Sequence, residues 1–122
     1  MNARAQTAEL QLPLTPAMFH VLASLADGEK HGYAILKEVA AQTQGGVRLS
    51  AGTLYGIVKR LLAEGMIAEC SERPAPELDD SRRRYYRLTD WGRQVARAEA
   101  ERMEKLIAMA RVKRLLKKLK TA

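Results

Sequence analysis

The sequence predicts a mainly α-helical fold with a small β-hairpin, in which one domain is followed by a long C-terminal helix. Three segments between residues 15 and 65 space their apolar residues three or four apart, as one face of a helix does. Two short segments, residues 66–70 and 84–88, have strand character. From Asp90 onward no proline interrupts a helical pattern, which at ~1.5 Å per residue would run for about 45 Å.

Composition places the chain among basic globular proteins. Its 122 residues are 47% hydrophobic, enough for one folded domain, and 21 Lys and Arg outnumber 14 Asp and Glu to give a formal charge of +7. Such an excess points first to a polyanionic partner, of which nucleic acid is the commonest. A basic surface without such a partner stays open as the alternative.

The sequence lacks the residue patterns expected for a metal site, a cofactor site or a membrane-spanning segment. It has one cysteine and two histidines far apart, so we expect no intrachain disulfide, no metal site and no cofactor. No apolar run approaches the ~20 residues that span a bilayer, and no signal peptide is recognised. No nucleophile–base pair or phosphate loop is found, so an enzyme is not expected. We expect a cytoplasmic protein.

The first helix follows an N-terminal arm, residues 1–14, which we expect to be flexible because it is polar and small. Thr15 is the predicted N-cap, and Pro16 fits the first helical position. The apolar face then runs to a stop at residues 27–28 and contains Met18, Phe19, Val21, Leu22 and Leu25.

The second helix is predicted from Gly32 to the glycine pair at residues 45–46. Its buried side is expected to contain Tyr33, Ile35, Leu36, Val39 and Ala40. His31, immediately before this helix, is expected to cap it or pack against it rather than to sense pH.

The third helix begins at Ser50 as N-cap and is predicted to stop near Gly65. Its core face contains Leu54, Ile57, Val58 and Leu61. The outer side contains Gly52, Tyr55, Gly56, Lys59 and Arg60. Glycine inside a helix costs about 1 kcal/mol against alanine, so two glycines on this side require an explanation.

Helix–helix–helix–hairpin is the order of a winged helix-turn-helix domain, which we assign to residues 15–89. In such a domain the third helix enters the major groove of DNA and the hairpin, or wing, touches the backbone nearby. The predicted DNA contacts are Ser50, Gly52, Thr53, Tyr55, Gly56, Lys59 and Arg60 of the third helix, with Arg82, Arg83 and Arg84 of the wing. The bare glycines would let the DNA backbone approach, and the cations would neutralise phosphates.

Each of these assignments has an alternative. Gly56 could serve only to admit a neighbouring helix, and Tyr55 could fill a partly buried gap. Lys59 and Arg60 could belong to a solvated face without a partner. In the wing tip, the acids Glu77, Asp79 and Asp80 would repel DNA or pair with the arginines that follow them.

Residues 90–122 are predicted to form a C-terminal dimerisation helix with a basic tail. Its apolar stripe contains Met103, Leu106, Ile107, Met109, Val112, Leu116 and Leu119. A stripe this long cannot be buried against one small core, so we expect it to pack on a second copy of the chain. The basic residues after Arg111 suit the negative end of a helix, and membrane binding is set aside because the apolar side lacks aromatic anchors.

Three ordered blocks of the sequence resemble the PadR family of bacterial transcriptional regulators: HGYAILKEV (31–39), LSAGTLYGIVKRLLAEGMI (49–67) and RRRYYRLTDWGR (82–93). The resemblance implies a winged-helix homodimer that represses genes and is released by a small molecule. It also implies that Ser50, Thr53, Tyr55 and Lys59 meet DNA and that the final helix crosses to the partner chain.

Two features depart from the family pattern. The segment 73–84 lacks the glycines common in family wings, and the single C-terminal helix is typical of the shorter branch. Some members bind flat aromatic drugs with aromatic residues in the dimer cleft. The middle of the final helix here offers Met103, Ile107 and Met109, and its one aromatic residue is Trp91 near the start, which we expect to be a core or interface residue. Cys70 is expected to be inert, because redox sensing needs an exposed thiolate and often a partner thiol.

The sequence therefore predicts a sequence-specific, homodimeric DNA-binding repressor that a small-molecule ligand relieves. Twofold symmetry predicts a pseudo-palindromic operator with half-sites about 34 Å apart, or a multiple of that distance. Two alternatives stay open: a sequence-tolerant architectural DNA-binding protein, and an adaptor that binds protein and not DNA.

Overall fold

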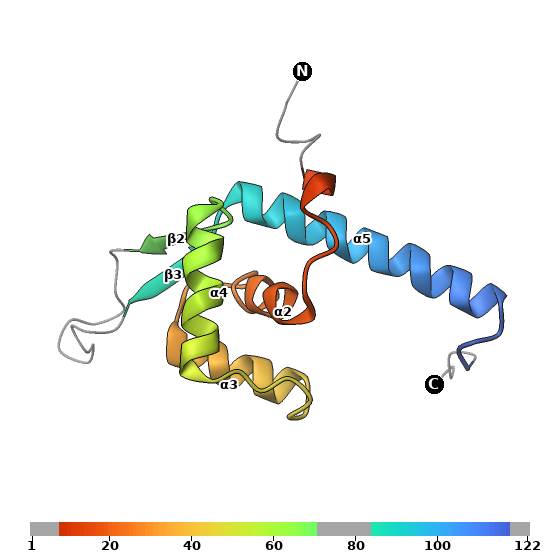
Figure 1. The fold of residues 1–122 in the computed structure, drawn as a ribbon, viewed down its shortest axis with the longest axis horizontal. Helices are drawn as coiled ribbons and strands as arrows, with labels where there is room; N and C mark the ends of the chain where they lie inside the picture. The colour runs from red at the N-terminus through yellow and green to blue at the C-terminus, as the bar shows by residue number, and fades with distance from the viewer. Residues whose placement is uncertain (1–7, 71–83, 118–122) are drawn as a thin grey trace, which may run out of the picture.

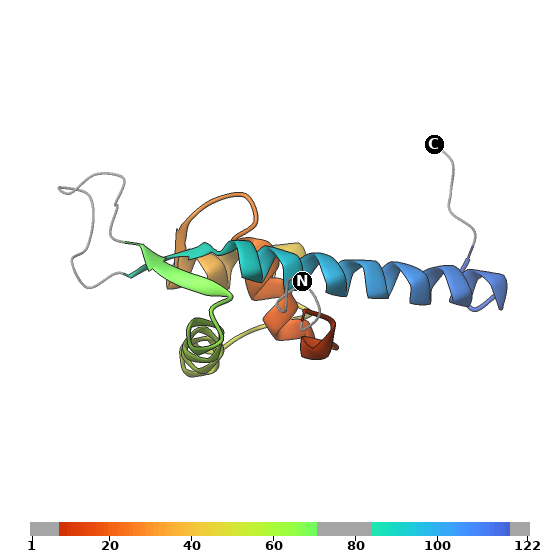
Figure 2. The same cartoon turned by 90° about the horizontal axis from the view of Figure 1, so that it is seen from above.

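Three helices and a small sheet form one unit, from which a long helix projects (Figures 1 and 2). The computed structural model describes residues 8–70 and 84–117. The elements are η1 (Glu9–Gln11), α2 (Pro16–Ser24), β1 (Lys30–His31), α3 (Gly32–Gln42), α4 (Ala51–Ala63), β2 (Ile67–Cys70), β3 (Tyr85–Leu88) and α5 (Asp90–Val112). The predicted fold class, a winged helix-turn-helix followed by a long C-terminal helix, is confirmed.

The predicted helix starts are confirmed by their caps. The Thr15 hydroxyl accepts from the Met18 amide at 3.1 Å, and the Ser50 hydroxyl accepts from the Thr53 amide at 3.0 Å. His31 caps α3, because its Nδ1 accepts from the Ala34 amide at 3.2 Å. A side-chain cap of this kind stabilises a helix by about 1 kcal/mol.

The core is aliphatic, as the low aromatic content suggests. Its fully buried members come from every helix and include Leu22, Ile35, Val39, Leu61 and Val95. Trp91 is buried too, which agrees with its expected place in the core.

The expected burial of Tyr33 is wrong, since this side chain is 60% exposed. Tyr33 precedes the buried Ile35 by two residues, which places it roughly 160° away around α3 at ~100° per residue. Its ring lies beside Lys37 instead, with the ammonium 5.4 Å from the ring centroid.

The sheet has three strands in the order β1–β3–β2, all antiparallel. The predicted hairpin is confirmed at its base, where Ile67 faces Leu88 and Cys70 faces Tyr85. Strand β1 has no counterpart in the sequence prediction, because two residues are too few to show a periodicity. The wing tip, including Glu77, Asp79, Asp80, Arg82 and Arg83, lies outside the described residues.

The expectation of a flexible arm over residues 1–14 is wrong for residues 8–14. Ala8 and Leu14 are 6% and 9% exposed, and η1 packs against α5. The amide of Leu14 donates to Oε2 of Glu99 on α5 at 2.7 Å. Ala8 and Leu14 join the core and Leu12 packs against it, whereas Leu10 is exposed. The overall polarity of the segment gave no sign of these contacts. Residues 1–7 lie outside the described part of the chain.

The start of α5 is locked to the turn before β2. Thr89 caps α5 through the Gly92 amide at 3.0 Å, and its hydroxyl donates to the Gly65 carbonyl at 2.6 Å. A Cβ built on Gly92 would lie 1.9 Å from the Met66 carbonyl oxygen, so this position requires glycine. The long helix therefore leaves the domain at a fixed angle.

The prediction of a helix of about 45 Å from Asp90 onward is wrong, since α5 ends at Val112. Arg114 takes a left-handed conformation with φ 60°, and the Leu115 amide donates back to the Ala110 carbonyl at 2.8 Å. This closes the helix without the glycine that usually marks such an end. Leu116 therefore lies beyond the helix, and Leu119 lies outside the described residues.

Candidate nucleic-acid interface

Helix α4 presents one face to the core and the other to solvent, as its spacing predicts. Leu54, Val58 and Leu61 are at most 5% exposed. The opposite side is exposed throughout and contains Gly52, Tyr55, Gly56, Lys59 and Arg60, which we call the α4 outer face. Tyr55 is 69% exposed, so it does not fill a gap in the core.

The fold does not require glycine at either glycine position of the α4 outer face. A Cβ at Gly52 or at Gly56 would have no described atom within 4 Å, and neither residue needs a left-handed backbone. Close packing of another described helix therefore does not explain Gly56. Glycine at each position lowers helix stability by about 1 kcal/mol relative to alanine, and no contact within the described chain explains why it is there.

The start of α4 is exposed and rich in donors. Ser50 accepts from the Thr53 amide and donates to the Thr53 hydroxyl at 2.9 Å. The first amides of a helix and its dipole attract an anion. Capping alone accounts for Ser50, and the exposed Thr53 hydroxyl lies next to the α4 outer face.

The two cations of the α4 outer face differ in their surroundings. Nε of Arg60 lies 3.4 Å from the Glu64 carboxylate one turn on, so part of its charge is offset. Lys59 makes no ion pair within the described residues. Lys59 is therefore the better placed of the two to neutralise an outside phosphate.

Arg84 stands at the base of the wing, where it pairs with Glu69 of β2 at 2.7 Å. This hydrogen bond raises the pKa of the Arg84 guanidinium, which stays charged. The sequence prediction considered acids of the wing tip as partners and missed Glu69, because only the strand register brings residues 69 and 84 together. Arg82 and Arg83 lie outside the described residues.

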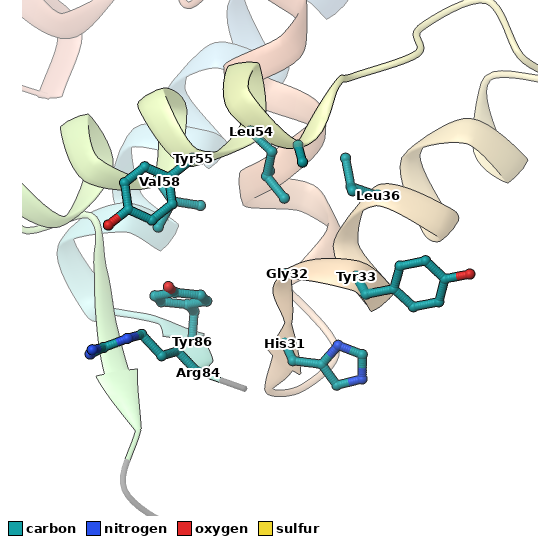
Figure 3. Close-up of a pocket in the computed structure, with 10 residues that line it drawn as sticks. His31, Gly32, Tyr33, Leu36, Leu54, Tyr55, Val58, Arg84 and Tyr86 are labelled. Carbon is teal, nitrogen blue, oxygen red and sulfur yellow. The ribbon is translucent and has the colours of Figure 1, made fainter. Parts of the chain in front are cut away.

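A hollow of about 410 Å³ lies between α3, α4 and β3 (Figure 3). Leu54 and Val58 of α4 line it from one side, and Gly32 lies across from them at the start of α3. Tyr55 and Tyr86 stand at one end beside Arg84, whereas the ring of Tyr33 points away. Burial raises the pKa of the Tyr86 phenol, so this hydroxyl keeps its proton. We call this space the α3–α4–β3 hollow.

Sequence reasoning missed Tyr33 as a surface residue. Tyr33 lies at the rim of the α3–α4–β3 hollow with its exposed ring turned away from it, toward the Lys37 ammonium. The spacing of Tyr33 and Ile35 already placed the two residues on opposite sides of the helix. The sequence prediction grouped them as buried because both are hydrophobic.

The buried face of α5 continues as an exposed stripe. Val95 and Glu99 are buried against the domain, and Met103 is half-buried one turn further on. Beyond it Leu106 and Ile107 are each 46% exposed, although they follow the same side of the helix. Met109 borders this stripe, whereas Val112 lies roughly 120° from Leu106 around the helix at ~100° per residue, and both are exposed. Figure 2 shows why, since this half of α5 extends past the rest of the domain.

The described ranges offer no metal-ion cluster and no membrane-spanning helix. Residues 8–70 and 84–117 hold no group of three or more His, Cys, Asp or Glu suited to a metal ion. No described helix combines the length and the apolar character needed to cross a bilayer.

Residues 21–98 match the family described as the transcriptional regulator PadR-like family. The chain is 38% identical over 90 residues to an uncharacterized 37.1 kDa protein in transposon TN4556 of Streptomyces fradiae, covering 74% of this chain and 24% of that protein. It is 36% identical over 87 residues to the transcriptional regulator Rv3488 of Mycobacterium tuberculosis, covering 71% and 75%. The chain thus spans about a quarter of the first relative and most of the second.

Solved structures share the fold. A PadR family transcriptional regulator from Eggerthella lenta aligns over 93% of this chain and 88% of its own, with 28% identity and a TM-score of 0.60. Bacillus subtilis PadR in complex with operator DNA aligns over 70% and 46%, with 24% identity and a TM-score of 0.58. Bordetella bronchiseptica BpsR, whose DNA binding is regulated by 6-hydroxynicotinic acid, aligns over 87% and 74%, with 25% identity and a TM-score of 0.59.

Proposed function

This chain belongs to the transcriptional regulator PadR-like family, and from that premise we propose that it is a homodimeric repressor that reads a pseudo-palindromic operator with α4. The observation that carries the proposal is the α4 outer face, which combines two bare glycines with an exposed tyrosine and exposed cations. Members of this family are DNA-binding transcriptional regulators and not enzymes, so the proposal concerns which residues bind DNA and how binding is controlled.

Bare glycines allow a close approach of the duplex. A sugar-phosphate backbone or base edge at Gly52 and Gly56 would meet only helix backbone, which brings Tyr55 within reach of a phosphate or a base. Lys59, with no acid partner among the described residues, would release counterions when it meets a phosphate. Arg60 would contribute less, because Glu64 competes for it.

The wing and α3 would extend this contact on either side. Arg84 at the wing base keeps its charge although Glu69 pairs with it, and Arg82 and Arg83 precede it in the sequence. Tyr33 at the start of α3 and Lys37 one turn further on are exposed and would contact the backbone of the same duplex. Ser50 and Thr53 would add hydroxyl and amide donors at the start of α4.

The exposed stripe of α5 supports a dimer. Met103, Leu106 and Ile107 continue the buried side of α5 where the domain no longer covers it, and Met109 borders them. Val112, exposed roughly 120° from Leu106 around the helix at ~100° per residue, would join the interface only at its edge. Such a stripe on a charged helix is suited to a second copy of the same surface, related by a twofold axis. Leu116 and Leu119, beyond the helix, would add to this interface only if the segment after Val112 turns back toward it.

Twofold symmetry places two α4 helices on one face of the dimer, which requires half-sites about 34 Å apart or a multiple of that distance. An effector that shifts the two α5 helices would change this distance and so lower the affinity for the operator. A relative with such control, regulated by 6-hydroxynicotinic acid, supports the existence of an effector but not its identity. The compartment we propose is the cytoplasm.

Selection of bound fragments from random DNA tests the proposal. We expect a pseudo-palindrome, bound by two chains, that is preferred over scrambled DNA by roughly a thousandfold at physiological salt. Equal affinity for both sequences would instead indicate an architectural DNA-binding protein. No binding at low salt would indicate an adaptor and would refute the proposed function.

A further inference from the structure

We propose that the α3–α4–β3 hollow is a binding site for a flat, uncharged hydroxyaromatic molecule, and that its occupant competes directly with DNA. The proposal rests on the proposed function, because it concerns control of the same α4 surface. It places a ligand within one protomer, away from the space between the two long helices.

The size and walls of the hollow select an aromatic occupant. Its volume of about 410 Å³ falls within the range of small-molecule sites, about 300–1,000 Å³. One end is apolar, where Gly32, Leu36 and Leu54 meet. Tyr86 lies across the hollow from Tyr55, so two aromatic rings border the other end. A flat ring inserted here would gain offset or edge contacts with these rings.

The polar end of the hollow selects a hydroxyl group. The hydroxyls of Tyr55 and Tyr86 lie on the same side as the Arg84 guanidinium (Figure 3). These groups supply both donors and acceptors, so a phenolic hydroxyl could donate one hydrogen bond and accept another. A ring with one hydroxyl therefore matches the division of the hollow into an apolar and a polar end.

The charge of the hollow favours an uncharged occupant over a phosphate. Arg84 already pairs with Glu69 at 2.7 Å, so a carboxylate offsets its charge at the rim. Nδ1 of His31 accepts a hydrogen bond from the Ala34 amide, which requires this nitrogen to be unprotonated. Among the described lining residues no cation is left without such compensation, whereas a phosphodiester binds best to unpaired cations.

Competition follows from shared residues. Tyr55 lines the hollow and also belongs to the α4 outer face that we propose meets DNA, and Ala51 lines the hollow at the exposed start of the same helix. A molecule that extends from the apolar end to the polar end would hold the Tyr55 ring and occupy the space through which a duplex approaches. DNA and this ligand would then exclude each other on the same protomer.

The experiment uses 2-naphthol as the probe and the full chain. Binding is followed by the change in naphthol fluorescence without DNA, and the operator is then titrated at several naphthol concentrations. We expect saturable binding, one molecule per protomer. At ten times the naphthol Kd the apparent Kd for the operator should rise about 120-fold, because each of the two protomers contributes a factor of about eleven. An increase of the apparent Kd for the operator by this factor is the signature of direct competition.

Two glycine variants locate the site. A Cβ on Gly32 would lie 3.6 Å from Cδ2 of Leu54, an ordinary contact, so Gly32→Leu fills the apolar end without a clash at Cβ. We expect it to abolish naphthol binding and to leave operator affinity within about twofold, an effect of less than about 0.5 kcal/mol. Gly52→Leu is the matched control, because it adds the same side chain to α4 outside the hollow and should leave naphthol binding unchanged. Tyr86→Phe, which keeps the ring, should weaken naphthol binding severalfold and covers the case in which Gly32→Leu does not fold.

Each other outcome overturns a stated part of the proposal. Absence of saturable naphthol binding, or full binding by both Gly32→Leu and Tyr86→Phe, rules out the site while leaving the proposed function untouched. Naphthol binding without any effect on the operator rules out competition. A large loss of operator affinity in Gly32→Leu would show that DNA itself enters the hollow. Failure to bind any DNA would refute the proposed function, and competition with it, whereas the naphthol data would still decide the site.

Discussion

The backbone amide of Leu14 donates to the buried carboxylate of Glu99 across a gap of 85 positions in the sequence. Glu99 is 1% exposed and also accepts from Arg102 on the same helix. These two donors keep a buried charge satisfied and tie the segment before α2 to the middle of α5. An uncompensated charge at this depth would be strongly destabilising.

Replacement of Glu99 should show how much its hydrogen bonds contribute to the stability of the fold. Glu99→Ala leaves the Leu14 amide without its acceptor, and we expect a loss of about 2–3 kcal/mol in the free energy of unfolding. Glu99→Gln keeps an acceptor and should lose less, about 1 kcal/mol. Denaturant titration measures both, and equal losses would mean that the hydrogen bond to Leu14 contributes little.

The same carboxylate should make stability depend on pH. Its hydrogen bond from Arg102 holds the pKa of Glu99 below its ordinary value despite burial. A lowered folded pKa means that the contribution is fully present above the unfolded pKa, ~4.3, and disappears as the pH falls through the folded value. The unfolding free energy of the wild type should therefore fall more steeply below about pH 4.3 than that of Glu99→Gln. Parallel curves would assign acid lability to other groups.

Tyr55→Ala should weaken operator binding by about tenfold or more while leaving the fold and the dimer intact. The side chain is 69% exposed, so its loss removes little core contact. A tenfold change corresponds to about 1.4 kcal/mol, the scale of one good base or phosphate contact. DNA titration beside a denaturation curve measures both effects, and unchanged affinity would remove Tyr55 from the interface.

Lys59→Ala should lower affinity for all sequences alike and reduce the slope of log K against log salt by about one unit. The reason is the loss of one phosphate contact and its released counterion. Lys105→Ala, an exposed lysine on α5, removes the same charge away from the α4 outer face and is the control. If both variants change the slope equally, Lys59 acts only through net charge.

Gly56→Ala should separate stability from function. Alanine at this exposed helical position has open space for its Cβ and should raise the unfolding free energy by about 0.5–1 kcal/mol. The same methyl group would stand between the helix and an approaching duplex, so operator affinity should fall. A variant that is more stable and binds equally well would argue against close approach at this residue.

Leu106→Glu should disrupt the dimer, because it places a charge in the exposed stripe of α5. Ala108→Glu is the control, since residue 108 lies roughly 160° around the helix from residue 106 at ~100° per residue. Light scattering at micromolar protein should report a monomer for the first variant and a dimer for the second. A dimer in both would place the interface elsewhere.

The sequence predicted the helices and the orientation of α4 because both depend on local signals. The Thr15 and Ser50 caps and the spacing of Leu54, Val58 and Leu61 are confirmed residue by residue. Where contacts come from distant segments, prediction failed. No local pattern announces that Leu14 meets Glu99 or that Arg84 meets Glu69.

Other errors arose from weak or absent local signals. The end of α5 was missed because Arg114 adopts a left-handed backbone without glycine. Tyr33 was misplaced because its hydrophobicity was weighed above its phase on the helix. The α3–α4–β3 hollow could not be foreseen, since three elements create it only when the sheet brings β3 beside the two helices.

The rigid joint at the start of α5 has a mechanical consequence. Gly92 in contact with the Met66 carbonyl and Thr89 bonded to the preceding turn leave no hinge between the domain and the helix. The 23 residues of α5 then act as a strut of about 35 Å that moves with the domain as one body. A tilt of about 5° at the far end of such a strut would carry the domain through roughly 3 Å, comparable with the spacing of neighbouring base pairs in DNA, ~3.4 Å. Small rearrangements where two struts meet are thus magnified at the duplex without any deformation inside the domain.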